Sequence, residues 1–118
     1  LLFDFWYGPA VLTERPSVRV RKFEDDRTYI TRVAEPVMHV SSNVVDVNYA
    51  IFVMDKVSSN IEQIKETHRI RYFFEPELKL MLKQCGFSLV RCEEWQTGRP
   101  AGFETWNAMV IARKTTER

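Results

Sequence analysis

Apolar residues recur at every second position in several stretches between residues 17 and 74, and this period of two predicts β-strands. The clearest case is Val44–Met54, in which every second residue from Val45 to Val53 is apolar or aromatic. Clusters of polar turn residues separate this run from its neighbours. We therefore predict an antiparallel meander over residues 17–74, with its first strands at Ser17–Phe23, Thr28–Met38 and Val44–Met54.

The last strand of this meander is ambiguous. Ile61, Ile64 and His68 would share one side of a helix, whereas Ile64 and His68 also fall at the spacing of a strand face. A polar turn before this stretch and a β-rich end both favour the strand. We predict one long strand, Ile61–Phe74.

The chain opens with a nearly continuous apolar run, Leu1–Tyr7, which predicts a strand buried on both faces, as in a parallel sheet. Gly8–Pro16 contains one glycine and two prolines, so it is predicted as a loop. A chain that starts inside a buried strand is expected to be part of a longer protein. Such a strand would expose an apolar edge, and we expect a homodimer or higher homo-oligomer through that edge or through the meander.

One helix, Pro76–Cys85, is predicted. Proline suits the first turn of a helix, and Gly86 suits the left-handed cap after the last turn. Apolar residues recur at i, i+3, i+4 and i+7, which predicts a buried stripe made of Leu78, Met81, Leu82 and Cys85.

Two further strands, Phe87–Trp95 and Glu104–Arg113, follow the helix, with a loop between them and a polar tail over residues 114–118. The predicted fold class is α+β: an antiparallel sheet meander with one C-terminal helix and a hairpin.

Composition excludes several classes of protein. The 118 residues fit one domain, and 17 Lys and Arg against 16 Asp and Glu give a net charge of +1. No overall field attracts nucleic acid or an anionic membrane, so neither is expected as a partner. No apolar run approaches the length of a membrane span. Cys85 and Cys92 form no metal-ligand pattern and indicate a reduced, cytoplasmic setting.

Motifs for cofactors and metals are also missing from the sequence. None of the four glycines belongs to a G-x-G-x-x-G loop or a P-loop. His39 and His68 are far apart, so no metal site is predicted.

Two groups of residues are candidates for a substrate pocket. Trp6 and Tyr7 close the first strand, where ligands bind in open α/β sheets, and they either line a pocket or fill the core beneath the next loop. His68, Arg71 and Tyr72 either form a pocket wall or belong to a solvated strand face. In a pocket, His68 could exchange a proton near neutral pH.

The stretch Thr67–Phe74, followed by Glu77-Leu78, Leu82 and Gly86-Phe87, resembles a recurring pattern near the end of class I S-adenosylmethionine-dependent methyltransferases. That pattern is a His/Arg-rich strand, an acidic-Leu helix start, and a Gly-Phe before the penultimate strand. The order strand, inserted antiparallel sheet, helix, strand, strand is similar to family members with a small β-sheet lid. Sugar N,N-dimethyltransferases and glycine or sarcosine methyltransferases are among these.

The resemblance implies a partial class I methyltransferase fold, the C-terminal part of such an enzyme. Residues 1–16 would belong to the core sheet, 17–74 to a lid over a small-molecule methyl acceptor, and 75–118 to the last helix and strands of the core. The loop that binds S-adenosylmethionine, and the catalytic residues, would lie upstream of Leu1. This chain alone would then hold no cofactor and be inactive. The implied substrate-binding residues are Trp6, Tyr7, Tyr49, Phe52, Met54, His68, Arg71 and Tyr72.

Two other functions stay open at this point. A long antiparallel sheet curved around one helix is also typical of modules that bind small ligands. A sheet of this kind also serves as a dimerisation module.

Overall fold

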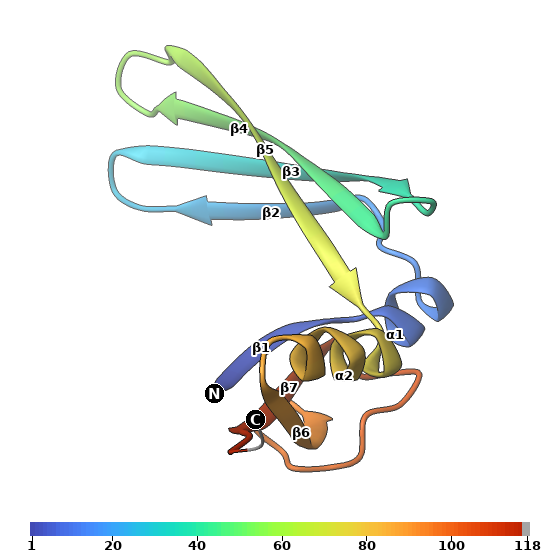
Figure 1. The fold of residues 1–118 in the computed structure, drawn as a ribbon. Coiled ribbons are helices and arrows are strands. Elements are labelled where there is room, and N and C mark those ends of the chain that lie inside the picture. The colour runs from blue at the N-terminus through green and yellow to red at the C-terminus, as the bar shows by residue number, and fades with distance from the viewer. Residues whose placement is uncertain (117–118) are drawn as a thin grey trace. The chain divides into compact units, whose positions relative to one another are not determined.

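The computed structural model describes residues 1–116 (Figure 1). The last two residues of the predicted polar tail, 117 and 118, lie outside the described residues. The chain divides into two compact units: a first unit made of Leu1–Arg15 and Arg71–Arg118, and a second unit made of Pro16–Ile70. The described elements are β1 (Leu2–Tyr7), α1 (Gly8–Thr13), β2 (Arg19–Glu24), β3 (Thr28–His39), β4 (Val44–Asp55), β5 (Ile61–Phe73), α2 (Glu75–Gln84), β6 (Phe87–Glu94) and β7 (Asn107–Lys114).

The second unit is the predicted antiparallel meander, and Figure 1 shows its long neighbouring strands joined by short turns. β2 pairs with β3 and β3 pairs with β4, both antiparallel, with Val33 opposite Ala50. Asp25 holds the first turn by accepting hydrogen bonds from the backbone N–H groups of Arg27 and Thr28, at 2.9 and 2.7 Å. The preference for a strand over a helix at Ile61–Phe74 is confirmed, because β5 runs from Ile61 to Phe73.

The antiparallel meander of the predicted fold class is only partly right, because the first unit adds a parallel pair of strands. β1 pairs antiparallel with β7, whereas it pairs parallel with the end of β5, where Trp6 is opposite Tyr72. Hydrogen-bonded strands follow the order β2-β3-β4-β5-β1-β7-β6, so the sheet is mixed. The C-terminal hairpin is confirmed, since β6 and β7 pair antiparallel. A parallel sheet was expected for β1, but its partner β5 was not identified, because nothing local in the sequence marks which distant strand lies beside β1.

The core of the first unit lies between α2 and one face of the sheet. It is made of Phe5, Leu78, Leu82, Ala108, Val110 and Ala112. Only half of the predicted helical stripe is buried, because α2 contacts the sheet through the i, i+4 pair Leu78 and Leu82. Met81 and Cys85 are exposed, so the prediction of a buried Cys85 thiol is wrong.

The stretch predicted as a loop after β1 contains a helix instead, α1. Pro9 suits the first helical turn, where its missing N–H would have had no partner. Ala10 and Val11 are fully buried and give this short helix its packing. Thr13 adds a hydrogen bond from its hydroxyl to the Pro9 carbonyl, at 2.7 Å.

β1 is buried on one face only, which corrects the prediction of two buried faces. Phe5 faces α2 and is buried, whereas Leu2 and Asp4, on the opposite face, are exposed. The reason is that α2 covers a single face of the strand.

Candidate functional site

The predicted site residues fall into two groups, one in each unit. Trp6, Tyr7, Arg71 and Tyr72 belong to the first unit. The second unit holds Tyr49, Phe52, Met54 and His68.

Trp6 and Tyr72 lie side by side where β1 and β5 meet. They are register partners in the parallel pair, and Trp6 packs edge-on against Trp106 with ring centroids 5.1 Å apart. Tyr72 is fully buried beside Phe74, at 6.0 Å between centroids. Within residues 1–116, the Tyr72 hydroxyl has no hydrogen-bond partner, which is costly for a buried polar group.

Tyr7 lies on the other face of β1 from Trp6, because successive side chains of a strand alternate. Its ring packs near Phe5, with centroids 6.3 Å apart. Burial raises the pKa of the Tyr7 phenol, and Cys92 and Glu75 raise it further. Burial also raises the pKa of the Cys92 thiol to about 11, so this thiol stays protonated and unreactive near neutral pH. Because Trp6 and Tyr7 point to opposite faces of β1, they do not line the same surface.

Arg71 is held by α2. Its guanidinium donates to both carboxylate oxygens of Glu77, at 3.1 and 2.8 Å, and lies 4.4 Å from the centroid of the Phe73 ring. Glu77 also accepts the backbone N–H of Phe74 at 3.1 Å, which satisfies a free donor before the helix. The hydrogen bond from Arg71 lowers the pKa of Glu77. These contacts fix the junction between β5 and α2.

In the second unit, Tyr49 and His68 come together. Their rings meet edge-on with centroids 5.0 Å apart, and the guanidinium of Arg32 lies 5.4 Å from the Tyr49 centroid. The carboxylate of Glu66 is 3.1 Å from Nε2 of His68. These side chains form an exposed or half-exposed aromatic and cationic surface on one face of the sheet.

Phe52 and Met54 face the opposite side of the same sheet from Tyr49. Their positions on β4 differ from that of Tyr49 by odd numbers of residues, which reverses the side-chain direction. They are half-buried opposite Thr31 and Tyr29 of β3. The four predicted site residues of the second unit therefore do not form one wall.

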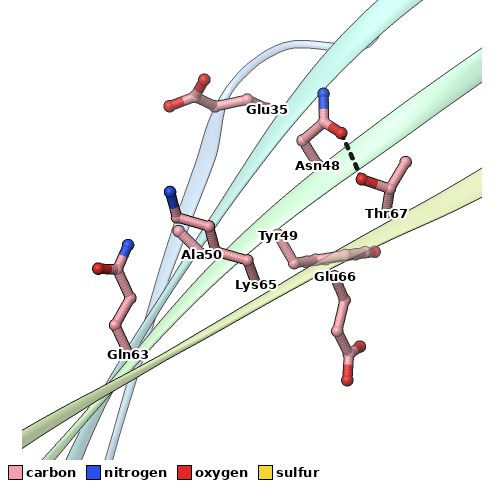
Figure 2. A pocket seen from close by; sticks show the side chains of 8 residues that line it. All are labelled: Glu35, Asn48, Tyr49, Ala50, Gln63, Lys65, Glu66 and Thr67. Atoms are coloured by element: carbon pink, nitrogen blue, oxygen red, sulfur yellow. Dashed lines mark hydrogen bonds between the residues drawn. The ribbon is translucent and has the colours of Figure 1, made fainter.

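A hollow of about 400 Å³ lies over β3, β4 and β5 of the second unit. The hydroxyl of Thr67 donates to the Asn48 side-chain oxygen at 2.8 Å within it. Figure 2 shows Glu35, Asn48 and Lys65 pointing to one side of the strands and Glu66 to the other. The residues that line the hollow are Glu35, Asn48, Tyr49, Ala50, Gln63, Lys65, Glu66 and Thr67.

An ion-pair network made of Asp46, Arg69 and His39 lies beside the hollow. Asp46 accepts two hydrogen bonds from Arg69, at 2.8 and 2.9 Å. Nε2 of His39 lies 2.9 Å from Oδ2 of Asp46, the oxygen that also accepts from Nη2 of Arg69. The hydrogen bond from Arg69 lowers the pKa of Asp46 to about 2. The network fixes β4 and β5 beside the hollow.

Sequence reasoning missed the hollow and Trp106. The signal for the hollow is the run of polar residues along β5, in which the period of two of a strand places Gln63, Lys65 and Thr67 on one face. No periodic signal marks Trp106, which lies in the long connection between β6 and β7.

No protein-family model matches this sequence, and no curated protein matches it. Solved structures do match. An S-adenosylmethionine-dependent methyltransferase from Clostridium acetobutylicum is 15% identical, with a TM-score of 0.72 over 97% of this chain and 44% of its own. An amino pentose methyltransferase from Micromonospora echinaspora, solved with S-adenosylmethionine bound, is 17% identical, with a TM-score of 0.65 over 97% of this chain and 44% of its own. A sugar N-methyltransferase from a Streptoalloteichus species is 10% identical, with a TM-score of 0.65 over 96% of this chain and 42% of its own.

The chain thus spans less than half the length of these solved methyltransferases, between 42% and 44%. At such low identities the likeness is one of fold, and it extends over nearly all of this chain. The chain therefore has part of the fold of the S-adenosylmethionine-dependent methyltransferases.

Proposed function

We propose that this chain is the C-terminal part of an S-adenosylmethionine-dependent methyltransferase and that it contributes the lid over the methyl acceptor. The observation that carries the proposal is the fold match, which takes in both the strands of the first unit and the meander of the second. One of the matched structures is an amino pentose methyltransferase, and another is a sugar N-methyltransferase. A small, hydroxylated amine is accordingly the proposed acceptor class.

The donor is proposed to bind to polypeptide outside these residues. A cradle for a nucleoside needs glycines that let the backbone approach the ligand closely. A Cβ at Gly8 would meet the Phe74 ring at 2.6 Å, so this glycine serves internal packing. Gly86, Gly98 and Gly102 have nothing within 4 Å of a Cβ and lie apart in the chain. The four glycines therefore do not form a cradle for the donor. We propose that the chain alone is inactive.

The acceptor contacts are assigned to the hollow of the second unit. Its amide, hydroxyl, ammonium and carboxylate groups can hydrogen-bond a hydroxylated ligand, and its volume of about 400 Å³ suits a small molecule. Methyl transfer from a sulfonium is an in-line displacement that depends mainly on positioning and on exclusion of water. The role proposed for Lys65, Asn48 and Thr67 is therefore orientation of the acceptor.

The test uses the complete gene product, including any coding sequence upstream of Leu1, and follows methyl transfer from S-adenosylmethionine to an amino sugar. Lys65→Gln removes one charged donor from the hollow, and we expect KM for the acceptor to rise about tenfold with kcat nearly unchanged. Lys79→Gln, on the exposed side of α2, is the matched control. A complete gene product that transfers no methyl group, or equal KM values for both variants, would contradict the proposal.

A small-ligand-binding module is the second candidate, because the hollow lies within the second unit alone. Calorimetric binding of an amino sugar to the 118-residue chain, together with a complete gene product that has no methyltransferase activity, would favour it.

A further inference from the structure

The hollow of the second unit lies over the smallest side chain on one face of β4. Side chains two positions apart share a face of a strand, so Ala50 stands on this face between Asn48 and Phe52. Both of these neighbours are larger than alanine. Ala50 is therefore the lowest point on this face of β4, and it is one of the residues that line the hollow.

Larger side chains also border Ala50 on the two neighbouring strands. Val33 is its register partner on β3. On the other side of β4, Lys65 of β5 lines the hollow together with Ala50, and Figure 2 shows Lys65 pointing to the same side of the strands as Glu35 and Asn48. The methyl group of Ala50 thus forms the floor of the hollow, and longer side chains form its borders.

Hydrogen bonds hold the strands under the hollow in place. The hydroxyl of Thr67 on β5 donates to the side-chain oxygen of Asn48 on β4, at 2.8 Å. Two positions farther along, Arg69 donates two hydrogen bonds to Asp46, at 2.8 and 2.9 Å. Side chains stand roughly perpendicular to a sheet. A longer side chain at position 50 would therefore extend into the hollow and fill it.

The floor and the borders of the hollow differ in chemistry. Ala50 presents an apolar methyl group, whereas Glu35, Asn48 and Lys65 present a carboxylate, an amide and an ammonium group. A hydroxylated ring amine has the matching division, with C–H groups on the faces of its ring and polar groups around its edge. Its ring can rest on Ala50 while its edge forms hydrogen bonds with the borders, as apolar and polar groups share the work in ligand pockets.

We propose that Ala50 is a specificity-determining residue, whose small side chain lets the ring of the acceptor lie flat on β4. The inference rests on the proposed function, because it places the acceptor in the same hollow. It adds that the size of the side chain at position 50 decides which amines are accepted. A larger side chain there excludes a ring-shaped acceptor by steric clash.

The test measures the binding of an amino sugar, glucosamine, to the complete gene product by calorimetry. We expect Ala50→Leu to weaken binding at least about 30-fold, and Ala50→Val, whose β-branched side chain suits a strand, to weaken it about fivefold. Ala50→Ser keeps a small side chain and should stay within about threefold. The affinity for S-adenosylmethionine should be unchanged in all three variants, because the donor is proposed to bind elsewhere.

Ala34→Leu is the matched control. Ala34 lies on β3 opposite Tyr49, so its side chain is on the other face of the sheet, and it is half-buried as Ala50 is. The same gain in size at this position should leave the affinity for glucosamine within about threefold. Thermal unfolding shows which variants fold. If Ala50→Leu does not fold, Ala50→Val against Ala34→Val makes the same comparison.

Three results would overturn the inference: no binding of glucosamine to the unmodified complete gene product, an unchanged affinity in Ala50→Leu, or an equal loss in Ala34→Leu. If Ala50→Leu binds as tightly as the unmodified protein while Lys65→Gln still raises KM, only this inference is lost. If Ala50→Leu alone loses binding but the complete gene product transfers no methyl group, only the proposed function is lost.

Discussion

At the scale of single residues, the carboxylate of Asp46 has a clearly lowered pKa. Arg69 donates two hydrogen bonds to it, and its pKa is lowered to about 2. Because the folded pKa lies below the unfolded value of about 3.9, this pair stabilises the protein above pH 3.9 and the effect is lost as the pH falls through 2. We expect Arg69→Gln to move the Asp46 midpoint, followed by carboxyl NMR, up towards about 4. Lys65→Gln is the control, and a midpoint near 4 in the unmodified protein would refute the pairing.

A second prediction at the scale of single residues concerns Glu77 and its effect on stability at the start of α2. Its pKa is lowered by the hydrogen bond from Arg71, so its contribution is complete above the unfolded pKa of about 4.3 and disappears as the pH falls through the folded value. Glu77→Gln should lower the free energy of unfolding at pH 7 by about 1 kcal/mol, a modest figure because the pair is partly exposed. The difference should shrink as the pH falls through the folded pKa of Glu77.

Denaturant unfolding at pH 7 and at a series of lower pH values measures this effect. Glu75→Gln removes a carboxylate from the same helical turn and leaves the Arg71 pair intact, so it serves as the control. Equal losses for the two variants at pH 7 would mean that general helix charge, and not the pair with Arg71, causes the effect.

The sequence identified several chemically capable residues but not their partners. Tyr49 and His68 were predicted together and lie in contact. Arg71 was considered for a pocket wall, yet its guanidinium is bound by Glu77, six positions away across a strand–helix junction that alternation does not describe. Phe52 turns away from Tyr49 because face assignment follows the parity of positions, which the list of candidates ignored.

At the scale of elements, Gly8 joins β1 to α1 against an aromatic ring. A Cβ there would lie 2.6 Å from two atoms of Phe74, so Gly8→Ala should destabilise the fold by about 1–3 kcal/mol. Gly102→Ala, with nothing within 4 Å of its Cβ, should stay within about 0.5 kcal/mol. Thermal unfolding compares them, and Phe74→Leu in the Gly8→Ala background should recover part of the loss. An unchanged stability for Gly8→Ala would show that the ring moves freely.

Strands were predictable because period-two alternation is a local signal, and the bounds of β4 and β6 differ by one residue from those expected. The sequence did not predict α1, because its six residues include a glycine and a proline and are too few to show the helical spacing of apolar residues. The parallel pairing of Trp6 with Tyr72 depends on positions far apart in the chain, and no spacing rule reveals it.

At the scale of the whole molecule, a homo-oligomer stays a prediction, with the second unit as its route. β2 pairs only with β3 among the described residues and exposes Val20 and Phe23. Exposed apolar edge strands favour association. Light scattering at micromolar concentration should give twice the mass of 14.0 kDa, and Val20→Lys should return it to the single mass, with Thr115→Lys as the control. A single mass for the unmodified chain would refute this route.

The central claim is that this chain contributes the lid over the acceptor, whereas other polypeptide binds the donor. Calorimetric titration of the 118-residue chain with S-adenosylmethionine tests it most directly, with the complete gene product titrated in parallel. The account predicts no binding to the chain alone at concentrations up to about 1 mM and micromolar binding to the complete gene product. Micromolar binding of S-adenosylmethionine to the chain alone would contradict it.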